Sequence, residues 1–101
     1  MITVRYERAG CHHSLTVEGH AGYSKQGNDI VCAAVSSISW TLIGYLVEEE
    51  PEYTAADTDR GYMEVTCTGG EKAANAFDMA VLGYRQIAQK YPQCVEVQIA
   101  E

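Results

Sequence analysis

The stretch ITVRYERAGCHHSLTVEG, residues 2–19, contains two runs in which apolar and polar residues alternate. The apolar members of these runs are Ile2, Val4, Tyr6, Leu15 and Val17. A period of two is typical of a strand with one buried face. Residues 8–10 (Arg-Ala-Gly) separate the runs and have the composition of a turn. The sequence therefore predicts strands over 2–7 and 11–19 that pair as a hairpin.

After residue 30 the period lengthens to three or four, which is typical of one face of a helix. The residues that recur in this way are Val31, Ala34, Val35, Ile38, Leu42, Tyr45 and Leu46. Trp40, Ile43 and Val47 form a second apolar stripe, so we expect this helix to be covered on two sides, either in the core or at a subunit interface. Pro51 ends the helix, because proline disfavours helical geometry in the residue before it.

The second half of the chain predicts strands over 53–56 and 62–68 around a turn at 57–61, then a helix closed by Pro92 and a last strand over 94–100. The apolar stripe of that helix is Ala73, Phe77, Ala80, Val81, Tyr84, Ile87, Ala88 and Tyr91. The order is strand, strand, helix, strand, strand, helix, strand. We expect an α+β fold, with two helices packed on one face of a mostly antiparallel sheet. A chain of 101 residues predicts a single domain over residues 1–101.

Composition limits the possible functions. The net charge of −7, with scattered basic residues, argues against a nucleic-acid partner. The N-terminus has neither the basic nor the apolar region of a signal peptide, so we expect the cytoplasm. Residues 30–47 are interrupted by serine, threonine and glycine, and we interpret them as too amphipathic for a membrane span.

The four cysteines form no CxxC pair, and in the cytoplasm we expect free thiols rather than disulfides. Cys11, His12 and His13 do not predict a zinc site, because neighbouring residues of a strand point to opposite faces. The sequence indicates neither a metal nor a cofactor.

The segment GHAGYSKQGNDIVCAAVSS, residues 19–37, is the candidate for chemistry. Its Cys32 lies in the first turn of the predicted helix, where Asp29 or Asn28 is a suitable N-cap. Unpaired N–H groups at a helix N-terminus stabilise a thiolate and are suited to bind an oxyanion. Cys32 is therefore a candidate nucleophile, and His20, at the end of the preceding strand, is its candidate base.

Two further features surround this pair. Ser36 follows Cys32 by four residues and shares its helix face. Gly22 and Gly27 bracket a loop that is either a lid over the site or a plain surface connection. A lone cysteine on a helix is also often only a small buried apolar residue, and for Cys11, Cys67 and Cys94 that interpretation is preferred.

The strings GHAG at 19–22 and G-x-D-I-V-C-A-A-V-S at 27–36 resemble the bacterial ribosomal-processing cysteine protease family, Prp. The resemblance implies a cytoplasmic, dimeric endopeptidase that removes an N-terminal extension from a precursor of a large-subunit ribosomal protein. It implies Cys32 as nucleophile, His20 as base, and Asp29 and Ser36 as supporting residues. It also implies a flexible loop over the site at 23–28. The residues expected to shape the loop or bind substrate are Gly19, Gly22, Tyr23, Lys25 and Gly27.

Two other functions fit the same residues. One is a non-enzymatic, ribosome-associated module that grips a peptide with the loop. The other is an anion-binding domain in which Gly19, Gly22 and the helix N-terminus hold a phosphate.

Overall fold

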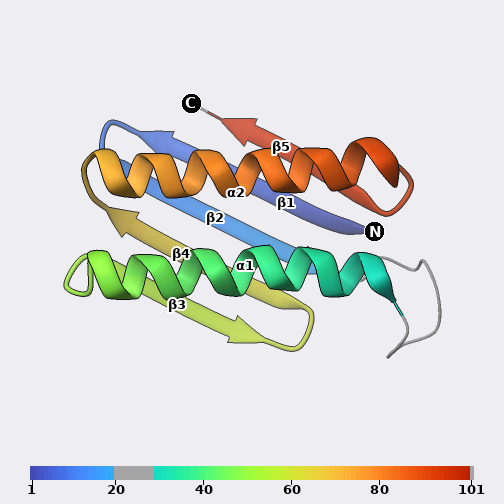
Figure 1. Ribbon diagram of the computed structural model, residues 1–101, viewed down its shortest axis with the longest axis horizontal. Helices are drawn as coiled ribbons and strands as arrows, with labels where there is room; N and C mark the ends of the chain where they lie inside the picture. The colour runs from blue at the N-terminus through green and yellow to red at the C-terminus, as the bar shows by residue number, and fades with distance from the viewer. Residues whose placement is uncertain (20–28, 101) are drawn as a thin grey trace.

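The structure, a computed structural model, describes residues 1–19 and 29–100 (Figure 1). Its elements follow the predicted order. They are β1 (Ile2–Ala9), β2 (His12–Gly19), α1 (Ile30–Glu49), β3 (Thr54–Asp59), β4 (Tyr62–Thr68), α2 (Glu71–Lys90) and β5 (Val95–Ala100).

The strands form one five-stranded sheet in the order β3-β4-β2-β1-β5. All neighbours are antiparallel except β1 and β5, which are parallel. Both helices lie side by side over one face of the sheet, and no helix or strand of the described residues covers the other face (Figure 1). The predicted α+β class, element order and mostly antiparallel sheet are confirmed.

The second hairpin differs from the prediction in where it turns. The strand expected at 53–56 instead continues to Asp59, which pairs with Tyr62. Only Arg60 and Gly61 remain for the turn, and Gly61 has a φ of 73°, which favours glycine. The polar residues 57–59 resemble a loop in sequence, but they form part of an edge strand because one glycine reverses the chain in so short a space.

Smaller shifts occur at two other strand ends. β1 extends to Ala9, which pairs with His12, so the first turn consists of Gly10 and Cys11 rather than residues 8–10. β5 begins at Val95, one residue later than predicted.

The helix α1 is apolar on more sides than the sheet can cover. Of its predicted second stripe, Ile43 is buried, but Trp40 and Val47 are 60% and 50% exposed. Of the two alternatives for this stripe, burial in the core is therefore wrong for Trp40 and Val47, and cover by a second subunit remains a prediction. By length and composition α1 is also apolar enough to cross a membrane, so its polar residues do not make it as amphipathic as predicted. In this fold its buried side lies against the sheet and α2.

The core between sheet and helices contains a stack of three rings. Phe77 of α2 is fully buried and lies 4.8 Å from the ring of His13 and 5.6 Å from that of Tyr6, centroid to centroid. The Tyr6 hydroxyl and Nδ1 of His13 share a hydrogen bond of 2.7 Å. The neighbouring His12 is exposed, which confirms that His12 and His13 point to opposite faces.

Burial makes His13 sensitive to acid. Its Nε2 has no hydrogen-bond partner among the described residues. Burial, together with the nearby Arg8, lowers the pKa of His13, and Asp78 opposes this only in part. A proton therefore binds the unfolded chain in preference to the folded one.

We expect the free energy of unfolding to be fully retained above the ordinary imidazole pKa of about 6.5 and to fall as the pH drops below it. For one proton the slope approaches about 1.4 kcal/mol per pH unit. Urea unfolding of the wild type and of His13→Leu at a series of pH values from neutral to acidic measures this. The His12→Ala variant, changed at the exposed neighbour, should keep the wild-type dependence. If the free energy of unfolding of His13→Leu falls equally steeply with pH, His13 is not the group responsible.

Candidate active site

A cavity of about 220 Å³ opens where β2 ends and α1 begins. Cys32 and Ser36, one helical turn apart on α1, both line it, so the prediction that they share a face is confirmed. The remaining lining residues come from β1, β2, α1 and the second hairpin. They are Ile2, Val17, Gly19, Val35, Ser39, Trp40, Thr58, Asp59, Gly61, Tyr62 and Met63.

Asp29 caps α1 and fixes the position of Cys32. Its Oδ1 accepts hydrogen bonds from the N–H groups of Val31 and Cys32, both at 3.0 Å. Cys32 is thus the third residue of the helix and lies in its first turn, as predicted, and the residue is half-buried. Of the two caps considered, Asp29 is confirmed.

The same cap occupies the donors that were expected to hold an oxyanion. The N–H of Ala33 also donates, to the carbonyl oxygen of Asp29 at 3.1 Å. The N–H groups of residues 31–33 are therefore already bonded, and the expectation that they are unpaired is wrong for this conformation. A carboxylate cap competes for the donors that an oxyanion or a phosphate would need, which also argues against the anion-binding alternative.

The floor of the cavity is tied to α2 by a buried hydrogen-bond chain. The Ser39 hydroxyl donates to the Val35 carbonyl at 2.8 Å, and the Tyr84 hydroxyl lies 2.7 Å from Ser39 Oγ. Because Ser39 Oγ already uses its proton, the Tyr84 hydroxyl donates to it. Burial raises the pKa of Tyr84 to about 12, so this donor keeps its proton near neutral pH. Ser39 was not predicted, although a serine on the buried stripe of a helix was a usable signal.

The opposite wall is formed by the tip of the second hairpin. Thr58, Asp59 and Tyr62 face the same cavity as Trp40 of α1. None of these was predicted as a site residue, because only the sheet order β3-β4-β2 brings the hairpin beside the end of β2.

Gly19 has a structural reason to be glycine. Its φ is 100°, and a Cβ at this position would collide with the carbonyl oxygen of Met1. β1 and β2 can therefore close together here only without a side chain. Its contact with substrate remains a prediction.

The other predicted site residues, His20, Gly22, Tyr23, Lys25 and Gly27, lie outside the described residues. Their roles, including the pairing of His20 with Cys32, remain predictions.

The other cysteines are free and lie away from the cavity. Cys67 is buried, with its Sγ 3.4 Å from the Thr54 hydroxyl oxygen, whereas Cys94 is half-buried and Cys11 exposed. Within residues 1–19 and 29–100, no group of three His, Cys, Asp or Glu side chains gathers as metal ligands would.

Comparison with known proteins identifies the chemistry. Residues 1–96 match the sequence profile of a family described as cysteine protease Prp. The chain belongs to the Prp cysteine protease family. It is also 32% identical over 87 residues to a ribosomal processing cysteine protease Prp of Mycoplasma pneumoniae, covering 83% of this chain and 84% of that protein.

Solved structures agree in fold. A Streptococcus mutans protein matches with a TM-score of 0.84 and 30% identity, over 100% of this chain and 96% of that one. An essential ribosomal processing protease Prp from S. aureus, in complex with a covalently linked product peptide, matches with a TM-score of 0.88 over 98% of this chain and 99% of that one. At 20% identity this second likeness concerns the fold alone. As a Prp family member, the protein is a cysteine protease.

Proposed function

We propose that this protein is an endopeptidase that removes the N-terminal extension of a large-subunit ribosomal protein, with Cys32 as nucleophile and His20 as general base. It acts as a single domain over residues 1–101, in the cytoplasm. One observation carries the proposal: Cys32 lines a cavity at the start of α1, whereas the other cysteines do not.

The reaction follows from the groups at this end of α1. His20 takes the thiol proton, and the Cys32 thiolate attacks the scissile carbonyl carbon. The tetrahedral intermediate collapses as the peptide C–N bond breaks, and His20 gives its proton to the leaving amine. Water then hydrolyses the acyl-enzyme and frees Cys32. Asp29 and Ser36 support this pair, Asp29 by fixing the first turn of the helix.

The oxyanion needs a donor that is not already engaged. Either substrate binding releases the N–H groups of residues 31–33 from Asp29, or a group outside this turn supplies the hydrogen bond. The side chain of Ser36, exposed on the same cavity, is one such donor.

The charge of the protein suits the proposed substrate. Its net charge of −7 attracts a basic partner and speeds encounter at low ionic strength. A relative from S. aureus has been crystallised with a substrate peptide, which supports peptide binding by this fold.

The deciding experiment incubates the wild-type protein with the tagged ribosomal precursor of its own organism. We expect a single cut, seen by mass spectrometry as a precursor shortened at its N-terminus. In parallel, the rate of Cys32 alkylation by iodoacetamide is followed against pH in wild type and in His20→Ala. A precursor that stays uncut by folded protein, together with alkylation no faster than that of a free cysteine, would leave only the non-enzymatic peptide-binding alternative.

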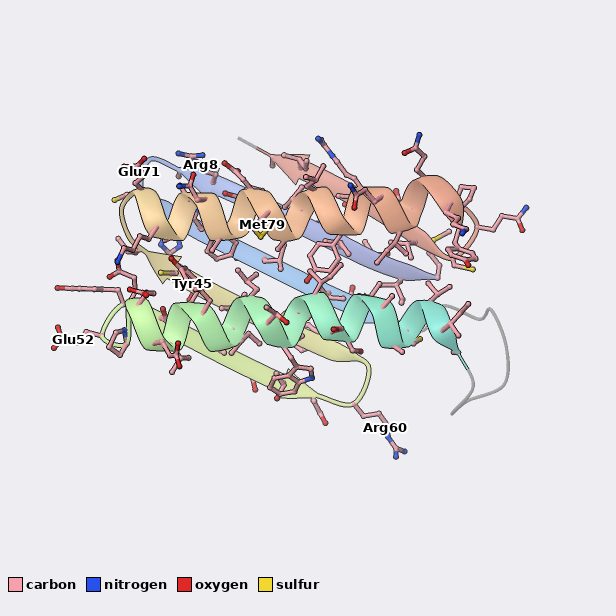
Figure 2. The ribbon with its side chains drawn as sticks, in the orientation of Figure 1. Arg8, Tyr45, Glu52, Arg60, Glu71 and Met79 are labelled. Atoms are coloured by element: carbon pink, nitrogen blue, oxygen red, sulfur yellow. The ribbon has the colours of Figure 1, made fainter. Side chains whose placement is uncertain are left out.

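We further propose that the protein is a homodimer that buries the outer face of its two helices. Exposed apolar side chains gather there around a groove of about 610 Å³ between α1 and α2. Tyr45, Met79 and Leu82 line it and are 38%, 74% and 57% exposed. Figure 2 labels Tyr45 on α1 and Met79 on α2. Each helix has 20 residues and is about 30 Å long and about 10 Å wide. Side by side, the two present an outer face of roughly 600 Å², near the roughly 800 Å² that each partner buries in a standard interface.

A charge placed in this groove should break the dimer. We expect Leu82→Glu to sediment as a monomer at micromolar concentration, because an unpaired carboxylate would have to be buried between the copies. Sedimentation velocity measures the change. Tyr53→Glu, which alters a residue that is 60% exposed and does not line the groove, is the matched control and should leave the dimer intact. A monomeric wild type would contradict the proposal.

A further inference from the structure

The strand β3 forms one edge of the described sheet. It pairs with β4 on one side, and no described strand covers the other (Figure 1). From Ala55 to Asp59 every residue is exposed, and Thr54 is half-buried. Proteins usually protect such an edge with proline, lysine, a bulge or a covering segment. Here the strand has none of these side chains, and its only charges are Asp57 and Asp59.

The pairing with β4 determines which backbone groups face outward. The Thr68 N–H donates to the Tyr53 carbonyl at 3.1 Å, so these two residues form a hydrogen-bonded pair just before β3. Hydrogen-bonded and non-bonded pairs alternate along an antiparallel ladder. The backbone groups of Ala56 and Thr58 therefore point away from β4, towards the free edge.

This edge leads into the cavity that contains Cys32. Thr58 and Asp59, at the end of β3, line the same cavity as Cys32 and Trp40. A chain that extends the sheet at β3 therefore ends beside the cavity that contains the thiol. Trp40, 60% exposed, forms the wall of the cavity on the helix side.

We propose that the peptide substrate adds to the free edge of β3 as a further strand, and that its backbone is held by Ala56 and Thr58 while the scissile bond reaches Cys32. The proposal rests on the proposed role of Cys32. Strand addition of this kind obtains affinity from main-chain hydrogen bonds and specificity from alternate side chains.

The two faces of β3 predict the chemistry of those alternate side chains. Ala56 and Thr58 pair with buried Val65 and Met63, so they lie on the helix side of the sheet, where small residues leave room for apolar substrate side chains. Asp57 pairs with Glu64 on the other face, so the intervening substrate side chains meet negative charge there.

Other charges extend this negative surface. Partial burial raises the pKa of Tyr62, and the carboxylates of Glu64, Asp57 and Glu18 raise it further. A substrate strand with apolar residues alternating with basic ones fits both faces.

The same charges disfavour a second copy as the occupant. Pairing two β3 edges would place Asp57 and Asp59 of both copies along one seam, and each copy carries a net charge of −7. Like charges on adjacent strands are destabilising. A basic peptide has no such penalty.

The first test uses a fluorescein-labelled synthetic peptide that spans the extension and cleavage junction of the organism's own precursor, with Cys32→Ala protein to prevent cleavage. Single backbone N–H groups of the peptide are methylated one at a time. Since alternate N–H groups of an added strand face β3, we expect methylation to weaken binding by about tenfold at every second position and to change it little in between. A loss without this period of two, or no loss at any position, overturns the proposal.

The second test changes the protein. Ala56→Pro removes an outward N–H without breaking the ladder to β4, and Asp57→Lys reverses a charge on the edge. We expect each to weaken peptide binding by about tenfold. Glu96→Lys makes the same charge change on β5, the opposite edge, and should have no effect. Thermal unfolding verifies that each variant is folded. If Ala56→Pro does not fold, the methylated peptides alone test the proposal.

The outcomes separate this inference from the proposed function. If wild type cuts the precursor but methylation shows no alternation, only strand addition at β3 fails. If wild type does not cut it, the protease proposal fails whatever the binding pattern. If Ala56→Pro converts dimer to monomer and leaves peptide affinity unchanged, the edge is an interface between copies and the inference is wrong.

Discussion

Alanine in place of Cys32 is expected to abolish cleavage of the ribosomal precursor, with kcat/KM lowered by about four orders of magnitude or more. Removal of a nucleophile eliminates the covalent intermediate, and no other cysteine lines the cavity to replace it. The fold should survive, because Cys32 is only half-buried. Precursor cleavage is followed by mass spectrometry at enzyme concentrations high enough to detect residual activity.

Cys94→Ala is the matched control for this variant. Cys94 is half-buried like Cys32 but lies outside the cavity, so its loss should leave cleavage within about twofold of wild type. If the Ser36 hydroxyl contacts the oxyanion, Ser36→Ala should lower kcat by a larger factor than it changes KM. Full activity of folded Cys32→Ala would require another nucleophile.

Phe77→Ala is expected to lower the free energy of unfolding by about 3–5 kcal/mol. Phe77 is fully buried and stacks on the rings of His13 and Tyr6. Its truncation removes apolar contact area and leaves a cavity beside an imidazole whose Nε2 already has no partner among the described residues. Small domains are stable by about 5–15 kcal/mol, so much of the stability would be lost.

Met79→Ala provides the comparison on the same helix. Met79 is 74% exposed, so in monomeric protein its truncation should change the free energy of unfolding by less than about 0.5 kcal/mol. Both variants are measured by urea denaturation at neutral pH in the monomeric Leu82→Glu background. Similar losses for the two would show that the ring stack does not stabilise this face of the core.

Hydropathy periodicity was sufficient to predict the helices and most strands, because one face of each element is buried. The predicted stripe of α2 is correct at Ala73, Phe77 and Tyr84, which are fully buried. The period-two pattern of β1 and β2 is likewise confirmed by their register.

The sequence was misleading where burial is one-sided or absent. β3 has no buried residue, so its length was underestimated: no hydropathy signal distinguishes Asp57 or Asp59 from a turn. For α1 the opposite holds. Its Trp40 and Val47 are apolar but exposed, and an apolar residue that lines a cavity, as Trp40 does, has the same hydropathy as one in the core.

Local chemistry was also easier to predict than long-range geometry at the site. The cap Asp29 and the position of Cys32 follow from a few adjacent residues. The wall formed by Thr58 and Tyr62 depends on sheet order, which no local pattern specifies. The sequence does not show that the Asp29 side chain also occupies the N–H groups of the first turn. This is seen only from the hydrogen-bond distances in the structure.

The contact between Gly19 and the carbonyl oxygen of Met1 has a practical consequence for handling the protein. Because Ile2 lines the cavity of Cys32, any affinity tag fused before Met1 would emerge beside the mouth of that cavity. The C-terminal strand β5 ends at Ala100, towards the opposite end of the molecule from the N-terminus (Figure 1). Purification handles and fluorescent labels therefore belong at the C-terminus, where they do not compete with a peptide for the site.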